Sequence, residues 1–336
     1  MRRITFFIGN GFDINVGLPT KYSQFYEYYK RNYPEDLLAK DIASDYEYWA
    51  DMEVGLGKYT SKVKMEDADL FWESEERLEQ ALADYLDMQT KDICVDPKEN
   101  AEILKKSLLG FYEELPKEQK MDISERIRGI KENITYSFIS FNYTNVLDLC
   151  IEAGREVFPK EIGSHKSDSG VTYAHTLGDV LHIHGTINEE LILGVNDASQ
   201  IANDEFCQNM LYKQLLLKEE ANKRFGQNKI QEARQIINES SIICTFGTSI
   251  GVTDRMWWGY ICNWLQKSIS HRLIIYAKND KPISRITKHL LFSRQNAILE
   301  NLKMNSGLGE EEWNQIRNRI YIKFDSEIFG FKIMHK

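Results

Sequence analysis

The sequence predicts an α/β protein built on a doubly wound parallel sheet, with a large helical insertion after the first strand. Three observations support this fold class. Short β-prone segments alternate with helical ones through the second half of the chain, as in parallel sheets that helices cover on both faces. A similar apolar segment, residues 4–8, opens the chain and stops at two glycines. Between these regions, residues 21–130 carry mainly helical periodicity.

The first strand and the insertion define the expected domain organisation. Residues 1–20 and 131–336 are predicted to form one domain, and residues 21–130 a helical insertion. Aromatic side chains from Tyr22 to Tyr29 recur on one face of the first helix of the insertion. The insertion is a candidate region for self-association into a homo-oligomer or for contact with another protein.

Six further strands are expected from β-prone apolar segments. In chain order they are residues 136–141, 180–185, 191–195, 241–247, 272–277 and 319–324. Helical periodicity predicts helices over residues 208–238, 255–268 and 284–301. The alternation of the two kinds of segment is the basis for expecting parallel strands.

The composition is that of a folded protein without a membrane segment. Of the 336 residues, 42% are apolar and 12% aromatic, and no stretch approaches the ~18 consecutive apolar residues of a membrane helix. The five cysteines contain no C-x-x-C pair, which indicates reduced thiols and predicts no structural zinc. We therefore expect a cytoplasmic protein. The net charge of −9 makes general attraction to nucleic acid unexpected.

The opening turn, Gly9-Asn10-Gly11, is typical of a nucleotide-binding strand end. Glycines let the backbone turn tightly and approach a phosphate, and a following helix offers free N–H groups to the anion. The dinucleotide fingerprint is incomplete, because Ile14 stands where its third glycine belongs. Asp13 places a negative charge near the expected phosphate, so it is assigned to helix capping or to a ribose hydroxyl. A glycine turn without a ligand is the alternative.

Two asparagines, Asn142 and Asn145, follow the strand predicted at residues 136–141. Ligands of open parallel sheets bind beyond the carboxyl ends of the strands. Amide side chains both donate and accept hydrogen bonds, so they are suited to orient a ligand amide or a water. The alternative is that both asparagines cap a helix that begins at Val146.

Two histidines, His182 and His184, end the next predicted strand and are expected on one face of it. Histidine titrates near neutral pH, which makes His184 a candidate general base. A metal site that includes His175 or Asp179 is a second interpretation. Because no ligand set with recognisable spacing accompanies the pair, we predict no metal. Hydrogen-bonded histidines in a packed strand are a third interpretation, above all for His182.

The stretch TFGTSIGVTD, residues 245–254, repeats the arrangement of the opening turn. A buried strand is followed by Gly247, Thr248 and Ser249, whose hydroxyl and N–H groups are predicted to hold phosphates or riboses. Asp254, which ends the stretch, is included among the predicted binding residues. Ser249 is not expected to be a catalytic nucleophile, because G-T-S-I-G lacks the spacing of a nucleophile elbow.

Taken in order, NGFDINVGLPTKYSQF, FNYTN, HIHG and FGTSIGVTD resemble the bacteriophage abortive-infection family AbiH, a branch of the sirtuin-like superfamily. The resemblance covers most of the chain, including the YWADME stretch of the insertion. It implies a Rossmann-like, sirtuin-like fold that binds NAD as substrate, in which Asn142 and His184 serve the reaction. The glycine turns at residues 9–11 and 247–249 are then expected to hold the phosphates and riboses.

The chain departs from sirtuin-type deacylases in two respects. They usually carry an aspartate two residues after the asparagine, where this chain has Thr144, and a cysteine-bound zinc module, which this sequence lacks. These departures argue against protein deacylation. Defence proteins of the superfamily tend instead to hydrolyse NAD, and this chain resembles them more closely.

The resulting prediction is an NAD glycohydrolase that breaks the bond between nicotinamide and ribose in anti-phage abortive infection. Asn142 is expected to hold the carboxamide or a water, and His184 to act as general base. One alternative is a module that senses NAD or ADP-ribose without turnover, and another is a metal-dependent hydrolase or nuclease that uses the HIHG histidines. The helical insertion is a candidate region for sensing a phage-derived trigger, which the sequence does not identify.

Overall fold

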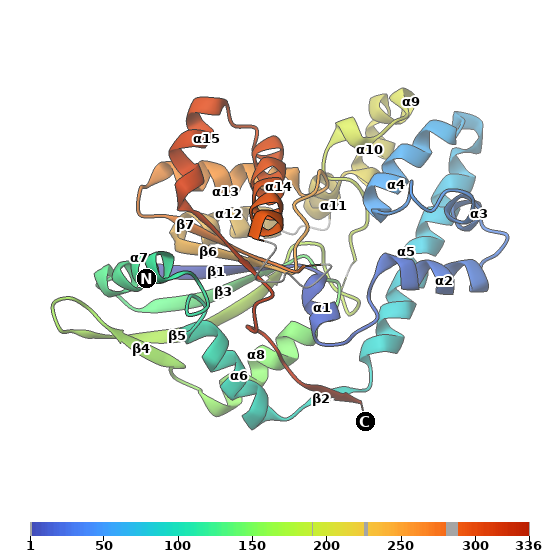
Figure 1. Ribbon diagram of the computed structural model, residues 1–336. Coiled ribbons are helices and arrows are strands. Elements are labelled where there is room, and N and C mark those ends of the chain that lie inside the picture. The colour runs from blue at the N-terminus through green and yellow to red at the C-terminus, as the bar shows by residue number, and fades with distance from the viewer. Residues whose placement is uncertain (1, 190, 225–227, 280–287, 336) are drawn as a thin grey trace.

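A mostly parallel sheet of seven strands forms the centre of the protein, with helices on both faces (Figure 1). The structure is a computed structural model that describes residues 2–189, 191–224, 228–279 and 288–335. The strands lie in the order β4-β5-β3-β1-β6-β7-β8. Their bounds are β1 Arg2–Ile8, β3 Ile134–Ser140, β4 Gly163–Lys166, β5 Thr172–His182, β6 Ser240–Phe246, β7 Arg272–Ala277 and β8 Ile320–Phe324.

Strand β1 lies at the centre of the sheet because it is apolar on both faces. It pairs in parallel with β3 on one side and with β6 on the other. Ile4 and Phe6 belong to the core below the sheet in Figure 1, whereas Phe7 belongs to the core above it. Such two-sided burial is the reason for the continuous apolar run in this strand.

The structure corrects one predicted strand of the sheet and adds one that the sequence did not predict. Residues 191–195 form no strand, and Val195 makes only an isolated bridge with Leu217. The apolar side chains of this segment are buried in a helical core instead, so its hydrophobicity serves helix packing. The antiparallel edge strand β4 was not predicted, because its sequence, GSHK, carries no apolar alternation.

Helices cover both faces of the sheet, as a doubly wound sheet requires. On the lower face in Figure 1 lie α6 and α8, and on the upper face α12, α13 and α15. The bounds are α6 Pro97–Leu109, α7 Lys117–Gly129, α8 Val146–Val157, α12 Lys229–Glu239, α13 Arg255–Lys267, α14 Lys288–Ser306 and α15 Glu310–Ile316. The first residues of the helix predicted over 284–301 lie outside the described part of the chain.

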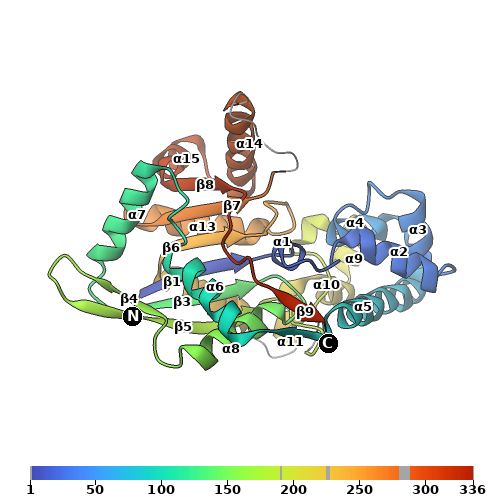
Figure 2. The same ribbon diagram turned by 60° about the horizontal axis from the view of Figure 1, so that its bottom comes forward.

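A second hydrophobic core forms a helical lobe, defined here as residues 22–90 and 191–217. Its centre contains Phe25, Trp49 and Phe71. The lobe lies beyond the carboxyl ends of the parallel strands (Figures 1 and 2). Its helices are α2 Tyr22–Asn32, α3 Leu37–Ser44, α4 Met52–Tyr59, α5 Ala68–Thr90, α9 Asp204–Gln208 and α10 Met210–Leu216, followed by α11 Lys218–Arg224. Short 3₁₀ helices span Thr60–Lys62, Met65–Asp67, Ala198–Gln200 and Arg317–Arg319.

The predicted insertion, residues 21–130, is mainly helical and is divided between the two cores. Its last helices, α6 and α7, bury Leu104 and Ile123 in the same core as Ile4 of β1. A short strand, β2 Ile93–Val95, pairs with β9 Ile333–His335 near the end of the chain. The assignment of residues 1–20 and 131–336 to one domain, with residues 21–130 as an insertion, stays a prediction, because packing alone does not define folding units.

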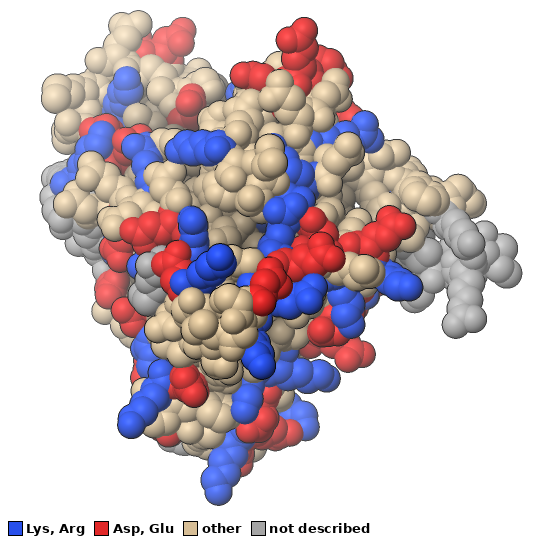
Figure 3. Space-filling model, turned by 90° about the vertical axis from the view of Figure 1, so that its left-hand side faces the viewer, with Lys and Arg blue, Asp and Glu red and all other residues tan. Residues whose placement is uncertain are grey.

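The surface carries charges of both signs. Figure 3 shows Lys and Arg intermixed with Asp and Glu on the face that carries the N-terminus and the β4–β5 hairpin. Interspersed charges of this kind are typical of a solvated surface. Among the described helices, none has the length and apolar character needed to span a membrane.

Candidate active site

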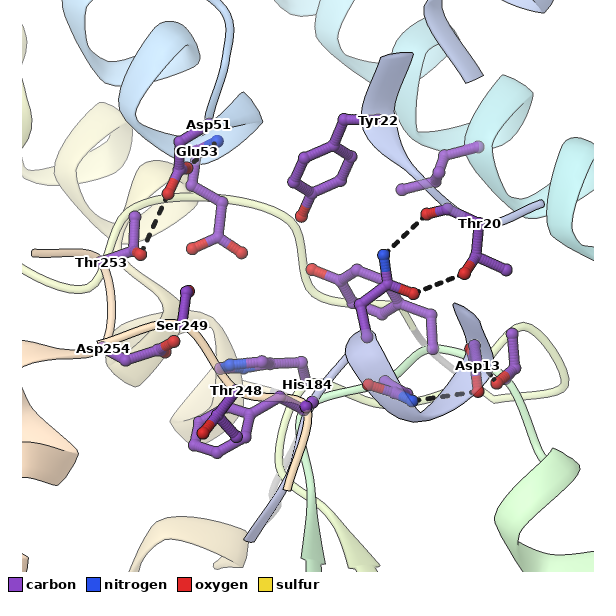
Figure 4. Close-up of a pocket in the computed structure, with 18 of the residues that line it drawn as sticks. Asp13, Thr20, Tyr22, Asp51, Glu53, His184, Thr248, Ser249, Thr253 and Asp254 are labelled. Carbon is purple, nitrogen blue, oxygen red and sulfur yellow. Dashed lines mark hydrogen bonds between the residues drawn. The ribbon is translucent and has the colours of Figure 1, made fainter. Parts of the chain in front are cut away.

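A cavity of about 360 Å³ lies where the carboxyl ends of the central strands meet the helical lobe (Figure 4). Every predicted site residue except Gly11 lines it. These residues are Gly9, Asn10, Asp13, Asn142, His184, Gly247, Thr248, Ser249 and Asp254. The lobe contributes Tyr22, Asp51, Glu53, Leu82 and Leu86. The structure therefore brings the four separate sequence stretches to one site, while the roles assigned to the residues stay predictions.

The order of the strands explains why the stretches meet. Strands β3 and β5 lie on one side of β1, whereas β6, β7 and β8 lie on the other. The chain thus changes direction between β1 and β6, and ligands of open α/β sheets bind in the crevice at such a point. The loops after β1, β3, β5 and β6 supply the sheet side of the cavity.

The two glycine turns pack backbone against backbone at this crevice. Gly9 N donates to Phe246 O at 3.0 Å, and Gly11 N donates to Gly247 O at 2.8 Å. A Cβ at Gly11 would lie 2.5 Å from Gly247 Cα, closer than any real contact. Gly247 itself has a φ of 68°, which favours glycine. The prediction that Gly11 leaves room for a phosphate is corrected, since its missing side chain makes room for the second turn.

Asn10 connects the opening turn to the Gly-Leu-Pro-Thr stretch that follows it. Its Nδ2 donates to Thr20 O at 2.7 Å, and its Oδ1 accepts from Thr20 Oγ1 at 2.6 Å. Both ends of the amide are therefore engaged within the loop. Asn10 lines the cavity, but these contacts fix the loop between residues 10 and 20.

Asp13 lies inside the short helix α1, Gly11–Asn15, and is 2% exposed. It accepts hydrogen bonds from Asn142 Nδ2 at 3.1 Å and from Thr144 Oγ1 at 2.7 Å. Desolvation by burial raises the pKa of Asp13 to about 6, against the lowering effect of these donors. The capping assignment of Asp13 is corrected, because Asn10 occupies the N-cap position of α1 and the carboxylate of Asp13 accepts from Asn142 and Thr144. Its contact with a ribose hydroxyl stays a prediction.

Asn142 is held by its backbone as well as by its side chain. Its N donates to Ser140 Oγ at 3.1 Å, and its O lies 3.1 Å from His182 Nδ1. Its Oδ1 is buried and has no hydrogen-bond partner among the described residues. The capping alternative does not describe the structure, since Asn145 occupies the N-cap position of α8 without a side-chain hydrogen bond.

The two histidines of the HIHG stretch have different surroundings. His182, the last residue of β5, contacts Asp148 through Nε2 at 2.9 Å and does not line the cavity. His184 lines the cavity beyond the strand end, is 5% exposed and packs near Phe141 and Tyr143. Its Nδ1 has no hydrogen-bond partner within the described part of the chain.

Burial and two nearby cations keep the His184 imidazole neutral. Desolvation lowers the pKa of His184 well below its ordinary value, and Lys218 and Lys229 lower it further. The ring therefore accepts or donates hydrogen bonds as a neutral group at physiological pH. Within the described residues, no three His, Cys, Asp or Glu side chains are grouped so that they could hold a metal ion.

Three carboxylates form an acidic wall of the cavity, defined here as Asp51, Glu53 and Asp254 (Figure 4). Asp51 caps α4 and accepts from Thr253 Oγ1 at 3.2 Å, while Glu53 forms a buried ion pair with Lys218. Desolvation by burial, with a further contribution from Glu53, raises the pKa of Asp254 to about 7. No hydrogen bond to the Asp254 side chain is present among the described residues.

Sequence reasoning missed Asp51 and Glu53 as residues of the cavity and Lys218 as the ion-pair partner of Glu53. The YWADME stretch, residues 48–53, was the only available signal, since an aspartate before an apolar run is a typical N-cap. No sequence signal indicated Lys218, which is buried and pairs with Glu53 of the lobe.

Comparison with known protein families shows the family to which this chain belongs. The sequence model of the family described as bacteriophage abortive infection AbiH matches residues 5–276. The chain belongs to the AbiH family. The matched region begins in β1 and ends in β7, so it includes the helical lobe and all four stretches that line the cavity. AbiH membership indicates a role in abortive infection by phage. No curated protein matches the chain.

The contact between the glycine turns of this AbiH protein is testable by Gly11→Ala. The added Cβ would clash with the Gly247 backbone, which cannot move as a flexible side chain would. We expect the free energy of unfolding to fall by about 1–3 kcal/mol, measured by urea denaturation. The control is Gly129→Ala, where a Cβ meets no atom within 4 Å. Equal stability of the Gly11 variant and the wild type would contradict the proposed packing.

Proposed function

We propose that this AbiH protein is an NAD glycohydrolase that cleaves the bond between nicotinamide and ribose during abortive infection. The main support is a pair of buried polar atoms in the cavity, Asn142 Oδ1 and His184 Nδ1, that lack partners among the described residues. Buried polar atoms are costly unless they form hydrogen bonds. A polar ligand in the cavity satisfies both atoms.

The arrangement of the sheet supports a dinucleotide as that ligand. From β5 to β8, the strand order has the pattern of dinucleotide-binding doubly wound sheets, with two strands on one side of β1 and three on the other. On this pattern and on the order of the motifs we base the sirtuin-like, Rossmann-like assignment. The cavity volume of about 360 Å³ falls within the roughly 300–1,000 Å³ of small-molecule sites.

The acidic wall suits the charge that develops during the reaction. When the bond between ribose and nicotinamide breaks, nicotinamide leaves as a neutral molecule and the ribose carbon becomes cationic. Carboxylates such as those of Glu53 and Asp254 stabilise a developing cation in a site that largely excludes water. Water then adds to the cationic carbon, which gives ADP-ribose and a proton.

The polar residues of the cavity have separate proposed roles. His184 accepts a hydrogen bond from the attacking water or from a ribose hydroxyl. Asn142 binds the carboxamide of nicotinamide or a water. Because no Lys or Arg lines the described cavity, hydroxyl and N–H groups of the turn that contains Thr248 and Ser249 hold the riboses and phosphates.

One observation favours a second candidate function. The lowered pKa of His184 makes its imidazole a weak base, which fits a protein that binds NAD or ADP-ribose without turnover. Release of nicotinamide from NAD distinguishes the two functions, since only the hydrolase produces it.

The hydrolase proposal is tested by His184→Ala. We expect nicotinamide release to fall on the order of a hundredfold or more, with NAD binding largely retained. The measurement is chromatography of NAD incubated with purified protein, alone and with lysate from infected cells. Asn142→Ala should reduce both binding and turnover, because Asn142 contacts the substrate in the ground state as well.

The choice of control for this test follows from the structure. His182→Ala is unsuitable, because His182 contacts the backbone of Asn142. His165→Ala is a better control. His165 is also a buried histidine, but it contacts His175, which pairs with Ile134 at the start of β3, the end of the strand away from the cavity. It should lose stability and keep its activity per folded molecule. Full activity of the His184 variant would contradict the proposed chemistry.

The acidic wall predicts how turnover depends on pH. Asp254, with a pKa of about 7, is neutral below that pH and ionised above it. Because only the ionised form stabilises a cation, kcat should rise between about pH 6 and pH 8, around the pKa of Asp254. Asp254→Asn should lower kcat and remove this rise, whereas Asp69→Asn, on the exposed side of α5, should change neither. An unchanged pH profile in the Asp254 variant would exclude this role.

A further inference from the structure

The Asn142 amide has one orientation that agrees with its buried contacts. Nδ2 lies 3.1 Å from Asp13 Oδ1, and the other oxygen of Asp13 accepts from Thr144 Oγ1 at 2.7 Å (Figure 4). An ionised carboxylate only accepts hydrogen bonds, so it pairs with the nitrogen of the amide and not with the oxygen. Asp13 therefore determines which end of the Asn142 amide is left for a ligand.

The backbone contacts of Asn142 keep the side chain in this position. The backbone N–H of Asn142 donates a hydrogen bond to Ser140 Oγ. His182 Nδ1 lies within hydrogen-bond distance of the backbone O of Asn142. Asn142 is 5% exposed and lines the cavity, where its Oδ1 has no partner among the described residues. The group presented to a ligand is thus a hydrogen-bond acceptor.

We propose that Asp13 is a positioning residue that sets the specificity of the cavity, by making Asn142 select ligands with an N–H or O–H donor at this position. The inference rests on the proposed function, in which the donor is the carboxamide NH₂ of NAD. The analogue that carries a carboxylate in place of the carboxamide, nicotinic acid adenine dinucleotide, has only acceptors there. Its carboxylate would face the Asn142 oxygen and lie near the Asp13 carboxylate, so both contacts are repulsive.

The specificity test compares the two dinucleotides in wild-type protein and in Asp13→Ala. In the wild type, kcat/KM and affinity should favour NAD over the acid analogue by roughly a hundredfold or more, because a site built for a donor rejects a ligand that lacks it. In Asp13→Ala the Asn142 amide is free to rotate and to offer its NH₂ to the carboxylate. The preference for NAD should then fall by at least about tenfold, a change of about 1.4 kcal/mol.

A ratio of this kind separates positioning from a merely structural role. General damage to the cavity lowers the affinity for both dinucleotides and leaves their ratio unchanged, and that result would overturn the proposal. Thr144→Val is the matched variant, since it removes the other hydrogen bond to Asp13 and leaves the contact with Asn142. Its preference for NAD should remain that of the wild type. If it fell as far as in Asp13→Ala, the effect would be structural and the proposal would fail.

A second measurement on the wild-type protein requires no ligand and no folded Asp13 variant. The side-chain NH₂ resonances of Asn142, identified by their loss in Asn142→Ala, should shift as Asp13 titrates with a pKa of about 6. Resonances that do not shift between pH 5 and pH 8 would overturn the proposed contact. If the wild-type protein binds neither dinucleotide, the NAD hydrolase proposal fails on its own, while this titration still decides the role of Asp13.

Discussion

The backbone contact between the glycine turns after β1 and β6 is the constraint on which the rest of the site depends. Gly11 and Gly247 approach so closely that a Cβ on either would meet main-chain atoms of the other turn. The contact places the ends of two neighbouring strands at one point, although their residues lie far apart in the chain. Asp13 and the hydroxyls of residues 248 and 249 reach the same cavity because these turns are fixed together.

The second determinant of the site is the helical lobe, which supplies two of the three carboxylates of the acidic wall. Asp51 is joined to the loop after β6 through Thr253, and Glu53 is neutralised in part by Lys218. A buried ion pair adds little net stability but fixes the position of its charges when both partners are present. The cavity therefore depends on the position of the lobe relative to the sheet. A site of this composition favours a cationic group, such as the nicotinamide ring of the proposed substrate, over a purely anionic ligand.

The sequence predicted which stretches line the cavity better than it predicted the contacts inside it. Strand ends of a parallel sheet share one edge, so polar residues after each predicted strand were expected to meet. The contact of Asp13 with Asn142 was not predictable, because local rules assign an aspartate in a first helical turn to capping. The lobe contacts, such as Glu53 with Lys218, join segments whose proximity depends on packing of the whole chain. The segment 191–195 was misassigned for another reason, because burial in a helical core and burial in a sheet give the same apolar pattern.

The most direct test of the central claim is the NAD content of phage-infected cells that express the wild-type chain or His184→Ala at equal levels. We expect NAD to fall after infection in wild-type cells, with nicotinamide and ADP-ribose formed in matching amounts. In cells with the variant, NAD should remain at the level of cells that lack the protein. Abortive infection by the wild-type protein with unchanged NAD would contradict the account.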